Sequence, residues 1–135
     1  MAIFNRFNSL VEALAEKKHD LGADQLAVAL SATAPVATNS TLSNITQISY
    51  TNLSSCNITT ISSGQTSGIY KLVLQDLVLT ASGAVATFRY ITLYNSTAPS
   101  QELLGWYDYG SNVTLASGET FTIDFDGTNG ALTIS

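Results

Sequence analysis

Two apolar runs near the middle of the chain have the pattern of β-strands. They cover residues 69–79 and 85–94, and the short segment between them, residues 81–84, contains a glycine. In both runs apolar side chains occupy odd and even positions alike, so neither face of the strand is polar. Strands that are buried on both faces have this character. The pattern predicts one long antiparallel hairpin at the centre of the fold, covered on both sides.

A helical period occupies the N-terminus. Large apolar residues recur there at spacings of three and four: Ile3, Phe4, Phe7, Leu10, Val11 and Leu14. The spacing predicts an amphipathic helix over residues 2–18, closed by a left-handed cap at Gly22. Its apolar stripe is expected to cover a sheet or to dock on a partner. Its polar face has too few cations for a helix that lies on a membrane surface.

The other segments are shorter strands and polar loops. We expect strands over residues 24–30, 45–53, 58–61, 102–109, 112–115, 120–125 and 131–134. We expect connections, rich in Ser, Thr, Gly or Pro, over residues 31–44, 62–68 and 95–101. The turn sequence at 126–130 predicts that the strands on either side of it, 120–125 and 131–134, form a hairpin. Together these segments predict a mainly β protein.

The architecture that fits this order is an antiparallel β-sandwich or squashed barrel of seven or eight strands with one N-terminal amphipathic helix. At 135 residues the chain fits a single domain over residues 1–135. Within it, the helix takes residues 1–20 and the β-sandwich residues 24–135. The loop at 31–44 is long for a compact domain, which makes it a candidate for partner contact. The contact candidates in it are Pro35, Val36, Thr38 and Asn39.

Composition and charge exclude several classes of partner. Charged residues make up 11% of the chain, against roughly 25% in typical domains. This suits a chain that packs against neighbours, and equally an ordinary sandwich with Thr-rich outer faces. The net charge is −5, and only Lys71 and Arg89 are basic beyond residue 18. With no basic stripe, a nucleic-acid partner is not expected. No signal peptide and no apolar run of membrane-spanning length is found, so no membrane partner is expected.

The residues that could carry chemistry are few. The lone Cys56 cannot form an internal disulfide, and His19, the only histidine, is expected to sit at the helix end, where its charge favours the helix dipole. No G-x-S-x-G motif is present, and too few His and Cys residues exist for zinc. Asp124 and Asp126 share one strand face and could be weighed as a glycosidase pair or calcium ligands, but a hairpin turn explains them more simply. We therefore expect no catalytic residues, no cofactor and no metal, and we do not expect an enzyme.

An aromatic group offers a binding alternative. Trp106, Tyr107 and Tyr109 lie on one predicted strand, whose alternation places Trp106 on the face opposite to the two tyrosines. Exposed Trp and Tyr side chains stack on sugars or anchor protein interfaces. Packing in the core or on the sheet is the other use of these rings. The three residues are candidate partner contacts.

The order of these pieces resembles that of small virion proteins of tailed bacteriophages, of the head decoration (cement) type. The segments that carry the resemblance are residues 4–14, 21–30, 34–39, 105–110 and 118–126. Lambda-type decoration proteins begin with an extended arm, whereas the helical period here begins near residue 2, so no lattice-binding role for residues 1–18 is carried over.

The resemblance implies a structural protein rather than an enzyme. Such a protein, commonly a homotrimer, is made in the bacterial host cytoplasm and ends on the capsid surface of the virion. It binds the outer surface of the major capsid protein lattice and stabilises the expanded head. The alternatives are a tail or head–tail connector protein, a carbohydrate-binding module that uses Trp106, Tyr107 and Tyr109, and a hydrolase that uses Asp124 and Asp126.

Overall fold

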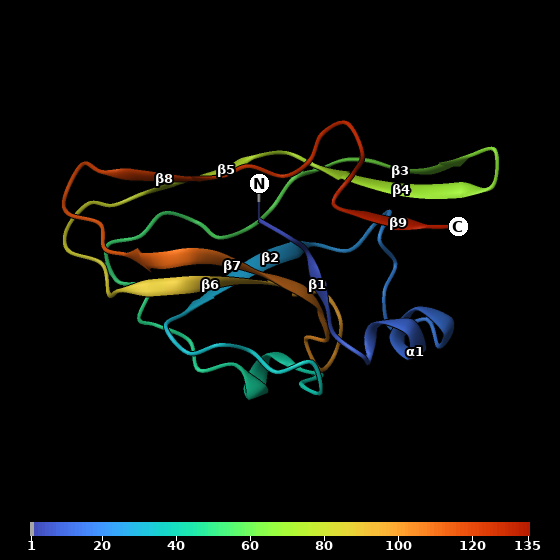
Figure 1. The fold of residues 1–135 in the computed structure, drawn as a ribbon, viewed down its shortest axis with the longest axis horizontal. Coiled ribbons are helices and arrows are strands. Elements are labelled where there is room, and N and C mark those ends of the chain that lie inside the picture. The colour runs from blue at the N-terminus through green and yellow to red at the C-terminus, as the bar shows by residue number, and fades with distance from the viewer. Residues whose placement is uncertain (1) are drawn as a thin grey trace.

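Antiparallel strands are the main regular structure of the computed structural model, which describes residues 2–135. The lower layer in Figure 1 is a four-stranded sheet, in the order β1 (Asn5–Arg6), β7 (Leu103–Val113), β6 (Phe88–Asn95) and β2 (Leu26–Ser31). Above it lie a three-stranded sheet, β3 (Thr60–Thr66), β4 (Ile69–Leu74) and β9 (Leu132–Ile134), and a two-stranded sheet, β5 (Leu77–Thr80) and β8 (Thr120–Ile123). The helical elements are α1 (Leu10–Ala15) and the 3₁₀ turn η1 (Leu42–Asn44). The mainly β prediction is confirmed, but the sheets stay open, so the squashed-barrel alternative is wrong.

The predicted central hairpin is wrong. Its first run forms β4 and β5 in the upper layer, whereas its second run forms β6 in the lower layer. The chain crosses between the layers after β5, where the Val85 N–H donates to the Leu115 carbonyl. β6 pairs instead with β2, from a distant part of the sequence, and with β7, the next strand along the chain. The two runs therefore lie in different sheets, and the apolar side chains of each run pack against different neighbours.

The predicted C-terminal hairpin is also wrong. β8 pairs with β5 and β9 pairs with β4, so the two strands lie one after the other along the upper layer. Between them the Phe125 N–H donates to the Asp76 carboxylate at 3.0 Å, and the Ala131 N–H donates to the Leu72 carbonyl at 2.8 Å. The alternation of residues 120–125 is nevertheless correct: Ile123 and Phe125 are buried, while Thr122 and Asp124 are exposed.

The main core fills the space between the two layers. Its largest side chains are fully buried leucines and one phenylalanine: Leu10, Leu26, Leu30, Leu72, Leu74, Leu79, Phe88, Leu93 and Leu104. Removing such a side chain from water contributes roughly 1.5–3 kcal/mol, so this cluster is the chief source of cohesion between the layers.

A second, smaller core lies on the outer face of the four-stranded sheet. It consists of Phe7, Ala29, Ile45 and Leu103, with Leu42, Tyr94 and Trp106 packed against it. The segment between β2 and β3 runs beneath the sheet in Figure 1 and supplies two of these residues from η1 and its neighbourhood. With covers on both faces, all six residues of β2 are buried.

Several predicted boundaries in the first half of the chain are corrected. Residues 45–53 contain no named strand; the Ile48 N–H makes a single backbone bond to the Leu30 carbonyl of β2. Residues 62–66, expected as a flexible connection, belong to β3. The hairpin of β3 and β4 turns at Ser67 and Gly68, whose φ angles are 54° and 83°. Positive φ at both central residues matches the right-handed twist of the strands, which is why a two-residue turn suffices.

The N-terminal helix is much shorter than residues 2–18. Residues 5 and 6 form β1, and α1 spans only Leu10–Ala15; Lys17, at φ 62°, follows its end, and Gly22 is not in a left-handed conformation. Phe4 stacks on Tyr107 at 5.6 Å between ring centroids, on the main-core side of β7. Phe7 stacks on Trp106 at 4.7 Å on the outer side. Two apolar residues that share a helical stripe in the sequence therefore pack on opposite faces of the sheet. No helix among the described residues is long and apolar enough to cross a membrane.

Candidate functional site

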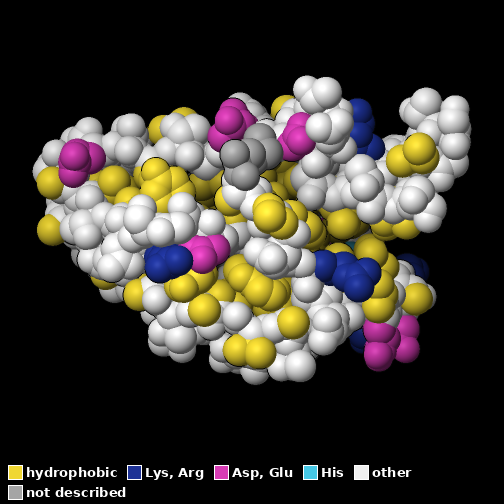
Figure 2. Space-filling view, viewed as in Figure 1, with side chains coloured by type: hydrophobic (Ala, Val, Ile, Leu, Met, Phe, Trp, Pro, Cys, Tyr) yellow, Lys and Arg dark blue, Asp and Glu magenta, His cyan; other side chains and the backbone are white. Residues whose placement is uncertain are grey.

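One side of the molecule leaves strand edges without partners in both layers. β1 pairs with β7 only at Gly105 and Trp106, so within residues 2–135 the outer edge of β7 has no paired strand from residue 107 onward. In the upper layer β8 and β9 are each paired on one edge only. We call this side, which faces the viewer in Figure 1, the open side. Figure 2 shows hydrophobic side chains along the gap between the layers on this side.

The opposite edge of the four-stranded sheet is covered. The Ile58 N–H donates to the Leu26 carbonyl at 2.9 Å, and the Val28 N–H donates to the Cys56 carbonyl at 3.0 Å. The segment before β3 thus continues the sheet beyond β2. The two edges of the four-stranded sheet therefore differ: the edge at β2 is covered, and the edge at β7 is free beyond Trp106.

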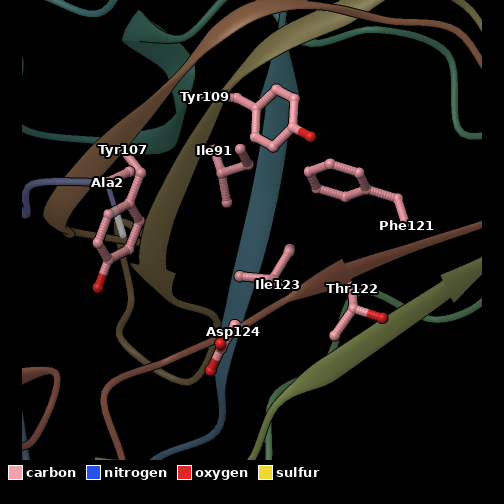
Figure 3. Close-up of a pocket in the computed structure, with 8 residues that line it drawn as sticks. All are labelled: Ala2, Ile91, Tyr107, Tyr109, Phe121, Thr122, Ile123 and Asp124. Atoms are coloured by element: carbon pink, nitrogen blue, oxygen red, sulfur yellow. The ribbon is translucent and has the colours of Figure 1, made fainter.

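A cavity of about 240 Å³ opens between β7 and β8 on the open side (Figure 3). We call it the aromatic groove. The residues that line it are Ala2, Ile91, Tyr107, Tyr109, Phe121, Thr122, Ile123 and Asp124. Figure 3 shows Ile91 and Ile123 between Tyr107 and Phe121, with Asp124 at one end of the groove.

The position of each ring in the groove follows from strand geometry. Tyr107 and Tyr109 are two residues apart on β7, so their side chains project from the same face. Phe121 projects from β8 and meets Tyr109 edge to face, with 5.0 Å between ring centroids and an interplanar angle of 75°. Tyr109 is 53% exposed and forms the rim of the groove, whereas Tyr107 is half-buried beside Phe125. The groove therefore has an apolar, aromatic wall that remains accessible.

The charge of the groove is negative. Asp124 is exposed and makes no hydrogen bond within the described chain, and no Lys or Arg lines the groove. The cation closest in sequence to the groove, Arg89, is held by Asp108 through two hydrogen bonds of 2.7 and 3.0 Å. This is the one ion pair within residues 2–135. Burial raises the pKa of Tyr107 to about 12, and the Asp126 carboxylate adds to the effect, so its phenol stays neutral and can donate a hydrogen bond.

Trp106 lies apart from the two tyrosines. It is half-buried against Phe7 on the outer face of the sheet, as the strand alternation predicted. Trp106, Tyr107 and Tyr109 therefore do not share one surface. The ring that joins the tyrosines is Phe121 instead.

The loop that contains the other contact candidates is ordered by hydrogen bonds. The Val36 N–H donates to the Asn39 side-chain oxygen at 2.9 Å, and the Asn39 N–H donates back to the Val36 carbonyl at 2.8 Å. Val36 is 58% exposed and Thr38 is exposed, while Pro35 and Asn39 are half-buried. The loop lies beneath the four-stranded sheet in Figure 1, and none of its residues lines the aromatic groove.

The two carboxylates near the C-terminus have separate roles. Asp126 accepts hydrogen bonds from the Asn129 and Thr128 N–H groups and from the Asn129 side chain, and these bonds, Asn129 first, hold its pKa below the usual range. A general acid needs the opposite shift. Both oxygens of Asp126 close a local turn, so they do not point at an ion. Within residues 2–135 no group of three His, Cys, Asp or Glu side chains could hold a metal.

His19 does not cap the helix. It is 6% exposed, four residues beyond the end of α1, and its Nδ1 is 3.0 Å from the Asn95 side-chain nitrogen, which also donates to Asp24 at 2.6 Å. Since the Asn95 nitrogen is a donor, Nδ1 accepts, and the imidazole is neutral. Burial lowers the pKa of His19, and the carboxylates of Glu102 and Asp24 oppose that shift.

Cys56 is half-buried, and burial raises the pKa of its thiol. A reactive thiolate needs the opposite shift. The side chain therefore fits a packing role, as expected, although it lies outside the named strands.

The groove also contains Phe121, Thr122 and Ile123, which the sequence does not mark as contact residues. The sequence shows the alternation of this strand. The hairpin expected with residues 131–134 does not form, and β8 instead faces β7 across the groove. Asp124 was considered as an acid, not as a charge at the rim of a contact surface. No known family model, curated protein or solved structure matches this chain.

Proposed function

We propose that the chain is a structural protein of a tailed-phage virion, a decoration protein that binds the outer surface of the major capsid protein lattice. The scaffold for this role is a two-layered β-sandwich with one open side. The protein stabilises the expanded head by adding contacts between neighbouring capsid subunits. It acts by adhesion, and its site is the capsid surface of the virion.

The observation that carries this proposal is the open side. Free strand edges beside apolar side chains attract another polypeptide, and isolated proteins usually protect such edges with charges, proline or a covering loop. Here the free edge of β7 borders a groove of aromatic rings, and Tyr109 at its rim is half exposed. Exposed tyrosine is a frequent anchor of protein interfaces.

The repetition of a capsid lattice suits a modest contact. A specific interface needs about 800 Å² from each partner. The open side and the loop that contains Pro35, Val36, Thr38 and Asn39 are separate surfaces, so one copy would contact two neighbouring capsid subunits. Contact with two subunits at once raises the apparent affinity without any further contact. Assembly of the protein into a homotrimer, as the resemblance implies, would multiply the effect.

The test mixes purified protein with bare expanded heads and measures co-sedimentation and the temperature at which the heads break. We expect binding at micromolar protein and a higher disruption temperature. Tyr109→Ser should weaken binding, whereas Val78→Ser, a matched change at a 51% exposed residue on β5, should not. Failure of the wild-type protein to bind heads at micromolar concentration rejects the decoration role. Labelling of intact virions would then distinguish a tail or connector position.

A further inference from the structure

We propose that the aromatic groove receives an extended segment of the partner protein that carries an arginine or lysine side chain. The inference rests on the proposed function, because it specifies the chemistry of the partner at the same open side. It has two parts: the backbone of the segment pairs with the free edge of β7, and its basic side chain enters the groove beside Asp124.

The backbone part follows from the way in which β1 ends. β1 pairs with β7 at Gly105 and Trp106. Among residues 2–135, the next residues of β7, 107–109, make no backbone hydrogen bond to the segment that precedes β1, although Phe4 packs on the ring of Tyr107 and Ala2 lines the groove. At Gly110, φ is 94° and the N–H donates to the Asp108 side chain at 2.8 Å, so the regular edge stops there. An added strand would therefore continue the line of β1 for about three residues. Strand addition of this kind gives affinity through main-chain bonds and specificity through alternate side chains.

The side-chain part follows from the walls of the groove. Tyr107, Tyr109 and Phe121 present aromatic rings, which attract a cation within about 6 Å of the ring centroid. Asp124 adds a carboxylate that no group of the described chain satisfies. An arginine combines a planar cation that stacks on rings with donors that match a carboxylate, and a lysine supplies the charge alone.

The charge of the residues around the groove excludes an acidic or a purely apolar segment. Beyond residue 18 the chain carries eight carboxylates against Lys71 and Arg89, and Arg89 is already paired with Asp108. An acidic segment would meet Asp124 with no cation in the groove to offset the repulsion. A purely apolar segment would bury Asp124 without a partner, which costs free energy. Charge complementarity therefore selects a basic occupant.

The first arm of the test uses defined peptides. A blocked heptapeptide of alternating valine and arginine, and its counterpart with glutamate in place of arginine, are titrated into ¹⁵N-labelled protein. We expect the arginine peptide alone to shift the amide signals of residues 107–109 and 120–124. Asp124→Asn should weaken its binding about three-fold, the size expected for one exposed ion pair. Glu12→Gln, the matched loss of an exposed carboxylate on α1, should leave binding unchanged.

Three results of this arm would overturn the inference. They are equal binding of the two peptides, equal binding by the wild type and Asp124→Asn, and signal shifts confined to residues away from β7 and β8. Because Asp124 makes no hydrogen bond within the described chain, its replacement by asparagine should leave the fold intact, and the unchanged remainder of the spectrum checks this.

The second arm separates this inference from the proposed function. Heads are mixed with the wild type, Asp124→Asn and Glu12→Gln at low and at high salt. Selective loss of binding by Asp124→Asn, greatest at low salt, supports the inference. Equal binding by all three proteins overturns it and leaves the decoration role in place. If the wild type does not bind heads, the decoration role fails, and the peptide arm decides the inference by itself.

Discussion

Replacement of Gly105 by alanine is expected to separate β1 from the rest of the sheet. Gly105 is buried in β7, between Leu93 of β6 and Arg6 of β1. A Cβ atom at this position would lie 2.7 Å from the Asn5 carbonyl oxygen and would overlap the ring of Phe4. The carbonyl belongs to the backbone, so a change of rotamer cannot relieve the overlap, and β1 has to move away from β7.

The magnitude follows from what β1 holds in place. Overpacking of a filled site costs about 1–3 kcal/mol. Displacement of Phe4, which packs on Tyr107, gives up part of the roughly 1.5–3 kcal/mol that its burial contributes. Since the two terms overlap, we expect Gly105→Ala to lower the free energy of unfolding by about 2–4 kcal/mol.

Urea unfolding monitored by Trp106 fluorescence and by circular dichroism measures this change. The matched control is Gly64→Ala in β3, where no atom lies within 4 Å of the added Cβ. The control should unfold within about 1 kcal/mol of the wild type, and a small gain is expected from the less flexible unfolded chain. If Gly105→Ala unfolds within about 0.5 kcal/mol of the wild type, the close contact of β1 with β7 is refuted.

Three further predictions concern titration and charge. Because burial holds the pKa of His19 below its ordinary 6.5, protonation is disfavoured in the folded state; the free energy of unfolding should fall as the pH drops below about 6.5, and His19→Gln should reduce this dependence in pH-controlled denaturation. Arg89→Met should leave the urea midpoint close to that of the wild type, since its pair with Asp108 is exposed to solvent, and a large drop in the midpoint would contradict this. Burial raises the pKa of both Tyr50 and Tyr107 to about 12, so both phenols should ionise late in an alkaline ultraviolet titration. Tyr107→Phe should reduce the absorbance change of this late phase, and an unchanged late phase would count against the burial of Tyr107.

Local pattern was sufficient for individual strands but not for their partners. The alternation at residues 120–125 and the apolar run that contains β2 predicted buried faces correctly, because the period of two is a local property of a strand. The pairing of β8 with β5 and of β6 with β2 depends on long-range contacts. The turn sequences at 81–84 and 126–130 predicted hairpins between consecutive strands instead, and those hairpins do not form. The N-terminal stripe failed for a similar reason: β1 pairs with β7, and this tertiary contact overrides the helical period at Phe4 and Phe7.

The candidate site was half visible in the sequence. The strand that carries Tyr107 and Tyr109 was identified, and the opposite orientation of Trp106 was predicted from alternation. Phe121 and Asp124 join the tyrosines only because β8 lies over β7 in the other layer, which no local pattern encodes. The free edge of β7 likewise depends on how far β1 extends along it.

Hydrogen exchange on the protein bound to expanded heads tests the central claim, that this chain works by docking through its open side. The exchange rates of the backbone amides in β7 and β8 are compared between the free and the head-bound protein. We predict that those amides of residues 107–109 and of β8 that point to the free edges, and not to β6 or β5, become protected on binding. Binding with unchanged exchange along β7 and β8, and new protection only elsewhere, would contradict the account.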